Sequence, residues 1–206
     1  MRLCYLLCVF ERIRKASRTK EEKRPDGSHR FEHWIKDNQL YFLTCCTKGH
    51  AHVFKSRQAQ EVFWQCFNRW HERSGFKVCV VTLMSSHYHL VGYAKVGQQL
   101  VDFVQGLHGS TARAVNPLLD QPLRPFWGER KGQSYFDGCL RDEEQASKAW
   151  TYTRDQAVKA GLVENWDEWP GTRVFVERDA MLKRATTLGA YLRGVPYKRY
   201  DNKAAR

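Results

Sequence analysis

The chain has 206 residues, a length that fits one domain with extensions but falls short of two full domains. Its 34 lysine and arginine residues outnumber its 22 aspartate and glutamate residues. The resulting net charge of +12 favours a polyanionic partner, with nucleic acid as the first candidate and a membrane surface as the competitor. No apolar run approaches the roughly 18 residues that span a bilayer, so we expect a soluble protein without a membrane partner.

The start of the chain combines an apolar run with a charged stretch. Residues 3–10 could imitate a signal peptide, but they run directly into the charged residues 11–15 without a small-residue cleavage site. We interpret the chain as a cytoplasmic protein of bacterial type, nucleoid-associated when bound, or as one read from an upstream start codon. Residues 1–37 are predicted to form a basic N-terminal extension.

Apolar spacing predicts alternating strands and helices in the next part of the chain. Residues 40–46, residues 76–84 and the run that begins at His87 are rich in the aromatic and β-branched residues typical of strands. Residues 57–73 and 97–116 instead carry apolar residues at helical spacing. The first half of the domain is therefore predicted to be strand, helix, strand, strand, helix.

A fourth strand and a further helix follow a proline-containing loop. The strand is predicted at residues 133–140, and the helix runs from the capping residue Asp142 to the stop at Gly161. The complete order is that of an α+β fold, a ferredoxin-like βαββαβ antiparallel sheet with an added C-terminal catalytic helix. Residues 38–170 make up this domain, and residues 171–206 are predicted to be a basic C-terminal tail of short helix or coil.

Two histidines one residue apart stand at the start of the third strand. Alternate residues of a strand point to the same face, so His87 and His89 could hold one divalent metal ion together. On their own they would more simply be two core histidines satisfied by hydrogen bonds. A second pair, His50 and His52, lies in a predicted turn and is interpreted as solvated loop residues.

Tyr152 and Gln156 are four residues apart in the last helix and are therefore predicted to share one helix face. A tyrosine in an amphipathic helix usually packs, with its hydroxyl at the rim. Opposite a metal-binding histidine pair, however, a tyrosine can attack a phosphodiester and become joined to phosphate. An amide oxygen from Gln156 would complete a neutral ligand set.

These segments resemble the motifs of one known family. Met84-Ser-Ser-His-Tyr-His-Leu-Val91 resembles the Met-Pro-Asn-His-x-His-Leu signature of single-tyrosine HUH transposases, and residues 152–163 resemble their tyrosine helix. Residues 126–128 and 135–144 also resemble the REP-associated tyrosine transposase (RAYT) branch, which is related to insertion-sequence transposases. The resemblance covers residues 38–170, which would form an HUH transposase-like catalytic domain.

The resemblance implies a role for each of these residues. Tyr152 would be the catalytic nucleophile, and His87, His89 and Gln156 would be the ligands of Mg2+ or Mn2+. The tyrosine would attack single-stranded DNA at a hairpin, giving a 5′-phosphotyrosine and a free 3′-OH, and the step would later reverse on another strand. The chain departs from the family pattern at Gln156, where the RAYT branch has asparagine, and at Ala157, which replaces proline.

Basic and aromatic residues around these motifs suit single-stranded DNA, whose phosphates pair with cations and whose bases stack on aromatic rings. Most of these cations could equally be solvated surface residues. The residues predicted to bind DNA are Arg113, Trp127, Arg130, Lys131, Arg141, Arg154 and Lys159.

Two other functions remain open from the sequence. The first is a catalytically silent, domesticated nucleic-acid-binding protein of the same fold, which would bind hairpin DNA without metal and without Tyr152. The second is a metal-dependent phosphodiesterase that uses water as its nucleophile, which would leave the tyrosine helix unexplained. The chain could act as a homodimer or as a monomer.

Overall fold

The computed structural model describes residues 35–128 and 135–192 of the chain. The predicted N-terminal extension therefore lies almost wholly outside the described residues, as do Arg130, Lys131 and the last part of the predicted tail. Within the described ranges, no helix is long and apolar enough to cross a membrane.

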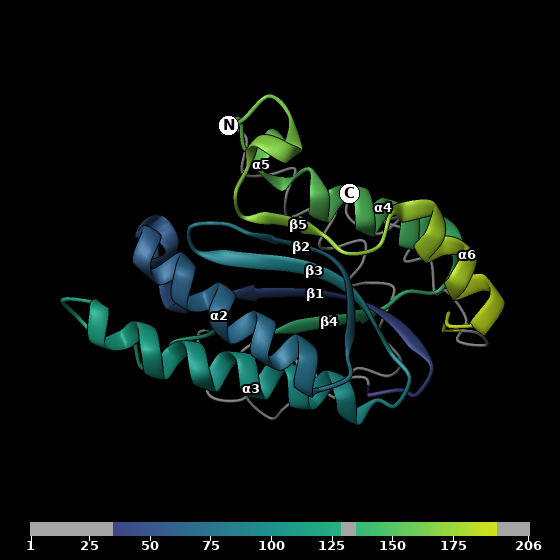
Figure 1. Ribbon diagram of the computed structural model, residues 1–206, viewed down its shortest axis with the longest axis horizontal. Helices are drawn as coiled ribbons and strands as arrows, with labels where there is room; N and C mark the ends of the chain where they lie inside the picture. The colour runs from purple at the N-terminus through teal and green to yellow at the C-terminus, as the bar shows by residue number, and fades with distance from the viewer. Residues whose placement is uncertain (1–34, 129–134, 193–206) are drawn as a thin grey trace, which may run out of the picture.

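The centre of the fold is a five-stranded antiparallel sheet (Figure 1). The order of its strands is β4-β1-β3-β2-β5, which is the ferredoxin-like order with one strand added beside β2. The two edge strands are short, with four residues in β4 and three in β5. The strands are β1 (Gln39–Cys46), β2 (Lys77–Leu83), β3 (His87–Ala94), β4 (Phe136–Cys139) and β5 (Thr172–Val174).

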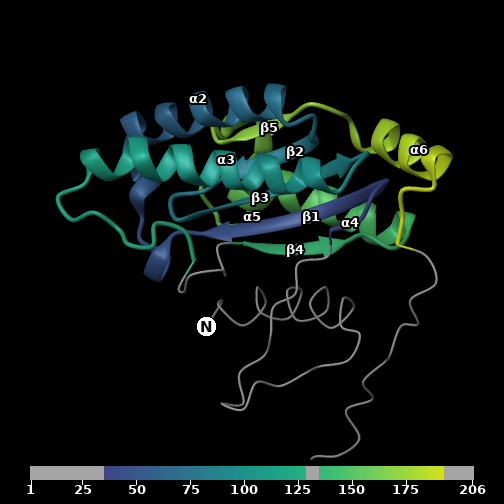
Figure 2. The same ribbon diagram turned by 90° about the horizontal axis from the view of Figure 1, so that it is seen from below.

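Helices cover both faces of the sheet, as Figures 1 and 2 show. Helices α2 (Arg57–Arg73) and α3 (Gln98–Val115) pack on each other over one face. Helices α4 (Glu143–Arg154) and α6 (Arg178–Leu188) cover the other. The short helix α5 (Gln156–Lys159) follows α4 directly. Single-turn 3-10 helices complete the fold: η1 (Lys48–His50), η2 (Val53–Lys55), η3 (Asn116–Leu118) and η4 (Trp166–Glu168).

The central strands are buried on both sides, because successive side chains point to opposite faces. Tyr41 and Leu43 of β1 belong to the core under α2 and α3. Leu40 and Phe42 belong to the core under α4 and α6. The same alternation in β3 places His87 and His89 on the face that α4 covers.

Local signals in the sequence fix the ends of several helices. The Ser56 side chain accepts a hydrogen bond from the backbone of Ala59 and begins α2. Asp142 accepts one from the backbone of Gln145, at 2.7 Å, and begins α4. Gly189 adopts a positive φ of 64° and ends α6, in the left-handed conformation that suits glycine.

The predicted fold class is confirmed, but the chain stays folded beyond the predicted boundary at residue 170. Strand β5 pairs with β2, and Met181 and Leu182 of α6 are buried in the core on the α4 side. Residues 171–192 are therefore part of the domain rather than a tail. The predicted last helix is also interrupted, because α4 ends at Arg154 and α5 begins at Gln156.

Candidate active site

His87 and His89 lie side by side on β3, as their spacing predicts. Their ring centroids are 5.0 Å apart, with the ring planes at 73°. His89 is 1% exposed, whereas His87 is only partly buried. The pair therefore forms the floor of a site on the α4 side of the sheet, with His87 nearer to solvent.

Hydroxyl groups orient both imidazoles. Nδ1 of His89 shares a hydrogen bond of 2.8 Å with Oγ1 of Thr44, its direct neighbour on β1. Nδ1 of His87 lies 3.2 Å from Oγ of Ser86. A partner on Nδ1 fixes the ring and makes Nε2 the nitrogen that would bind a metal.

Both imidazoles are held in the neutral form. Burial, together with nearby His50 and His52, lowers the pKa of His87 to about 4. Burial lowers the pKa of His89 well below its ordinary value, and electrostatic interactions with His87 and Lys159 add to this effect. Neutral imidazole is the form that coordinates metal ions.

The second histidine pair borders this site. His50 and His52 are exposed, in agreement with the loop interpretation, and Nδ1 of His52 lies 2.8 Å from Oγ of Ser85. Both nevertheless act electrostatically on His87 and help to lower its pKa. This proximity could not be predicted from the sequence, because it depends on the path of the chain around Ser85.

Tyr152 lies on α4 directly against His89. The two ring centroids are 5.4 Å apart in an edge-to-face arrangement, and Phe42 of β1 contacts both rings, at 5.8 Å from His89 and 6.0 Å from Tyr152. Burial raises the pKa of the Tyr152 hydroxyl, and a contact with the Gln156 side chain offsets part of the increase. The structure thus brings the predicted nucleophile to the predicted metal pair.

Gln156 reaches the same cluster although the helix is interrupted at the residue before it. Asp155, with φ −90° and ψ 15°, separates α4 from α5. Gln156 is 4% exposed, and its Nε2 donates to the backbone carbonyl of Tyr152 at 3.1 Å. With the amide nitrogen engaged, Oε1 is the atom that could face a cation.

A cation and two indoles secure the break at Asp155. The Arg154 guanidinium bonds both carboxylate oxygens of Asp155, at 2.7 and 3.3 Å. It also stacks over Trp150 at 5.1 Å and over Trp166 at 5.5 Å. Arg154, predicted to bind DNA, is therefore already engaged inside the protein, and its sequence position alone gives no sign of this role.

The donor set fits a divalent metal ion. Within the described ranges, no group of three or more His, Cys, Asp or Glu side chains is placed to hold a metal. A metal would therefore rest on His87, His89 and the amide oxygen of Gln156, which are neutral ligands of types that bind divalent cations. Such a set leaves other coordination positions for substrate or water.

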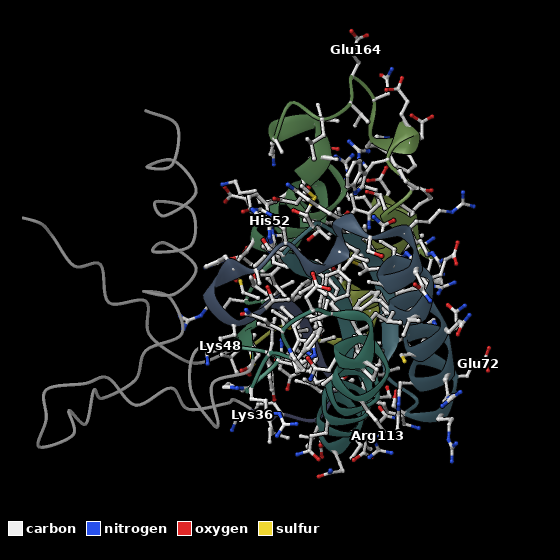
Figure 3. All side chains as sticks on the ribbon, turned by 90° about the vertical axis from the view of Figure 1, so that its left-hand side faces the viewer. Lys36, Lys48, His52, Glu72, Arg113 and Glu164 are labelled. Carbon is white, nitrogen blue, oxygen red and sulfur yellow. The ribbon has the colours of Figure 1, made fainter. Side chains whose placement is uncertain are left out.

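The remaining predicted DNA contacts do not gather at this site. Trp127 is 4% exposed and stacks on His108 at a centroid distance of 4.5 Å, so it is a core residue without an open face for a base. Arg113 lies on α3, across the sheet from α4, and Figure 3 shows it far from His52. Arg141 precedes the opposite end of α4 from Tyr152. Lys159, in contrast, lies beside the tyrosine.

Comparison with known proteins agrees with this geometry. A family model described as IS200-like transposase matches residues 36–156, more than half of the chain. The chain belongs to the IS200-like transposase family. The match includes the histidine pair, Tyr152 and Gln156, so this transposase carries its candidate site within the family region.

Two solved structures resemble this member of the transposase family. A REP-associated tyrosine transposase bound to a REP hairpin matches with a TM-score of 0.57 and 12% identity, over 83% of this chain and 94% of its own. A putative transposase from Deinococcus radiodurans R1 matches with a TM-score of 0.40 and 21% identity, over 60% of this chain and 89% of its own. The first match supports the α+β transposase fold. No curated protein matches the chain.

Proposed function

We propose that this transposase cleaves and rejoins single-stranded hairpin DNA through a covalent bond between DNA and Tyr152. The observation that carries the proposal is the contact of Tyr152 with His89, at 5.4 Å between ring centroids, on a face that also holds His87 and Gln156. A structural tyrosine would not need two neutral, oriented histidines beneath it.

The chemistry balances without an external energy source. The Tyr152 oxygen forms a bond to phosphorus, and the bond from phosphorus to the 3′ oxygen breaks. The phenol proton passes to solvent, and the departing 3′ oxygen takes one up, which gives a 5′-phosphotyrosine and a 3′-OH. Because one phosphodiester replaces another, the step can reverse on a second strand.

His87, His89 and Gln156 would hold Mg2+ or Mn2+. When bound, the cation supplies charge that stabilises the phosphate oxygens during the transfer. The protein contributes the orientation: Thr44 and Ser86 fix the two imidazoles, and Phe42 supports the ring of Tyr152. Neutral ligands leave the full charge of the cation available to the phosphate.

The same features support a DNA partner and a site that is complete in a monomer. The net charge of +12 suits DNA, and the similar transposase structure contains a REP hairpin. Tyr152 contacts His89 within one chain, which supports a site that a monomer can complete without exchange of helices. The protein would work in the cytoplasm, where the nucleoid offers its substrate.

A denaturing gel tests the proposal. The purified protein is incubated with labelled single-stranded hairpin DNA from the flanks of its own gene, with Mn2+ or with EDTA, and is compared with Tyr152→Phe. We expect a slow-migrating covalent band for the wild type with Mn2+ alone. Tight binding by both proteins without a band would identify a silent DNA-binding descendant. Cleavage without a band in both would identify a phosphodiesterase that uses water.

A further inference from the structure

Lys159 lies over the ring of Tyr152. Its Nζ is 4.5 Å from the ring centroid, within the range of a cation–π interaction. The two residues are seven positions apart and belong to different helices, α4 and α5. The contact is therefore not an ordinary neighbour contact along one helix face.

The break at Asp155 lies between these two residues in the chain. Seven residues of a continuous α-helix rise about 10.5 Å, and side chains lean toward the N-terminus, so a tyrosine does not normally meet a lysine seven positions later. Here Asp155 leaves the helical conformation, and the backbone N–H of Lys159 bonds the Asp155 carbonyl at 2.9 Å. The Arg154 and Asp155 ion pair lies at this break, between Tyr152 and Lys159 in the chain.

Burial lowers the pKa of Lys159, and the negative charge of Asp155 offsets part of this effect. Among the described residues, no carboxylate lies within ion-pair distance of Lys159. Its charge also reaches His89, the imidazole beneath Tyr152. Tyr152 therefore contacts both the ammonium of Lys159 and the ring of His89, a candidate metal ligand.

We propose that Lys159 is a positioning residue, whose ammonium holds the ring of Tyr152 in the orientation needed to attack the phosphate. This inference rests on the proposed function, and it gives Lys159 a task other than the DNA contact predicted from the sequence. A surface contact to DNA would change the affinity of the protein for DNA. Positioning of the nucleophile instead changes the rate at which the covalent bond to DNA forms.

The kinetic test separates these two roles. The full-length protein and its Lys159→Met, Lys159→Arg and Lys148→Met variants are compared on the flanking hairpin DNA with Mn2+. Lys148 is the matched control, because it lies one turn before Tyr152 on α4 and pairs with Glu144 on the exposed surface. The two readouts are the dissociation constant for DNA and the rate of covalent band formation at saturating DNA.

We expect Lys159→Met to slow band formation about tenfold at saturation while changing DNA affinity less than about threefold. Lys159→Arg, which can also stack on the ring, should recover most of the rate, and Lys148→Met should match the wild type. Weaker DNA binding with an unchanged saturating rate would overturn the positioning role. So would a Lys159→Arg variant as slow as Lys159→Met.

A second measurement does not depend on cleavage. In protein labelled with 13C-lysine, the ring current of Tyr152 should shift the ε-methylene protons of Lys159 upfield, and Tyr152→Leu should remove the shift. Covalent band formation by a wild type without this shift would overturn the role of Lys159 alone. A shift in a wild type that forms no covalent band would overturn the proposed function, and the role of Lys159 with it.

Discussion

The two faces of the sheet carry different side chains although the same strands form both. Under α2 and α3 the packing is aromatic, with Phe63 in contact with Phe54, Phe67 and Tyr88. Under α4 the buried residues include His89 and Gln156. The alternation of strand side chains thus gives one face a largely aromatic core and lets the other carry the polar groups of the candidate site.

The largest expected effect is on catalysis alone, at the face that carries Tyr152. Tyr152→Phe should remove the covalent band while leaving the fold intact, because it deletes only the reacting oxygen and keeps the ring against His89. The band is measured on a denaturing gel and the fold by thermal denaturation. A variant that still forms the band would show that another residue is the nucleophile.

The next expected effect lies on the opposite face. Phe63→Ala should lower the free energy of unfolding by about 3–5 kcal/mol, because Phe63 is fully buried among aromatic rings. Urea denaturation measures the loss, and covalent band formation by the protein that remains folded should be unchanged. A folded Phe63→Ala protein with an impaired saturating rate would show that the two faces are coupled.

A histidine on the aromatic face, His108, should make the stability of the protein depend on pH. Burial lowers the pKa of His108 to about 3, and its Nε2 lies 2.9 Å from the Tyr88 hydroxyl. Below about pH 6.5 the unfolded chain therefore binds a proton at His108 that the folded chain does not, so stability falls as the pH falls.

His108→Gln should make the unfolding free energy depend less on pH, because the unfolded chain then binds one proton fewer. Between about pH 6 and pH 4, its unfolding free energy should fall about 1.4 kcal/mol less per pH unit than that of the wild type. Urea denaturation at a series of pH values measures the slope. An unchanged slope would mean that His108 does not titrate differently in the folded and unfolded chains.

The smallest expected effect concerns the orientation of a single ring. Thr44→Val removes the hydrogen bond to Nδ1 of His89 and should raise the Mn2+ concentration for half-maximal band formation about tenfold. Thr82→Val is the control, because Thr82 flanks His89 on β2 but bonds Thr172 instead, at 3.0 Å. Equal changes in the two variants would contradict an orienting role for Thr44.

The sequence predicted those parts of the molecule that depend on local pattern. Two histidines at a spacing of two must share a strand face, and a capped helix after β4 brings Tyr152 near them once the strand order is known. Family resemblance supplied the pairing of the two motifs. The fold class therefore followed from local pattern, and the proximity of His89 and Tyr152 followed from local pattern together with the resemblance.

The parts that the sequence did not predict depend on tertiary contacts. Strand β5 has three residues and exists only because it pairs with β2. Trp127 follows a proline-containing loop. The local sequence there does not show whether its indole is buried or exposed to solvent. The break at Asp155 is specified by an ion pair and two stacked indoles, one of which, Trp166, comes from a later segment.

The short edge strands of the sheet have a consequence for how copies of the protein meet. An open edge exposes unpaired backbone groups to which another chain can add a strand, and long, flat edges invite aggregation. Strands β4 and β5 offer only four and three residues for such pairing. Self-association through strand pairing at the sheet edges is therefore disfavoured. Several copies of this positively charged chain could bind one DNA molecule without their sheets pairing edge to edge.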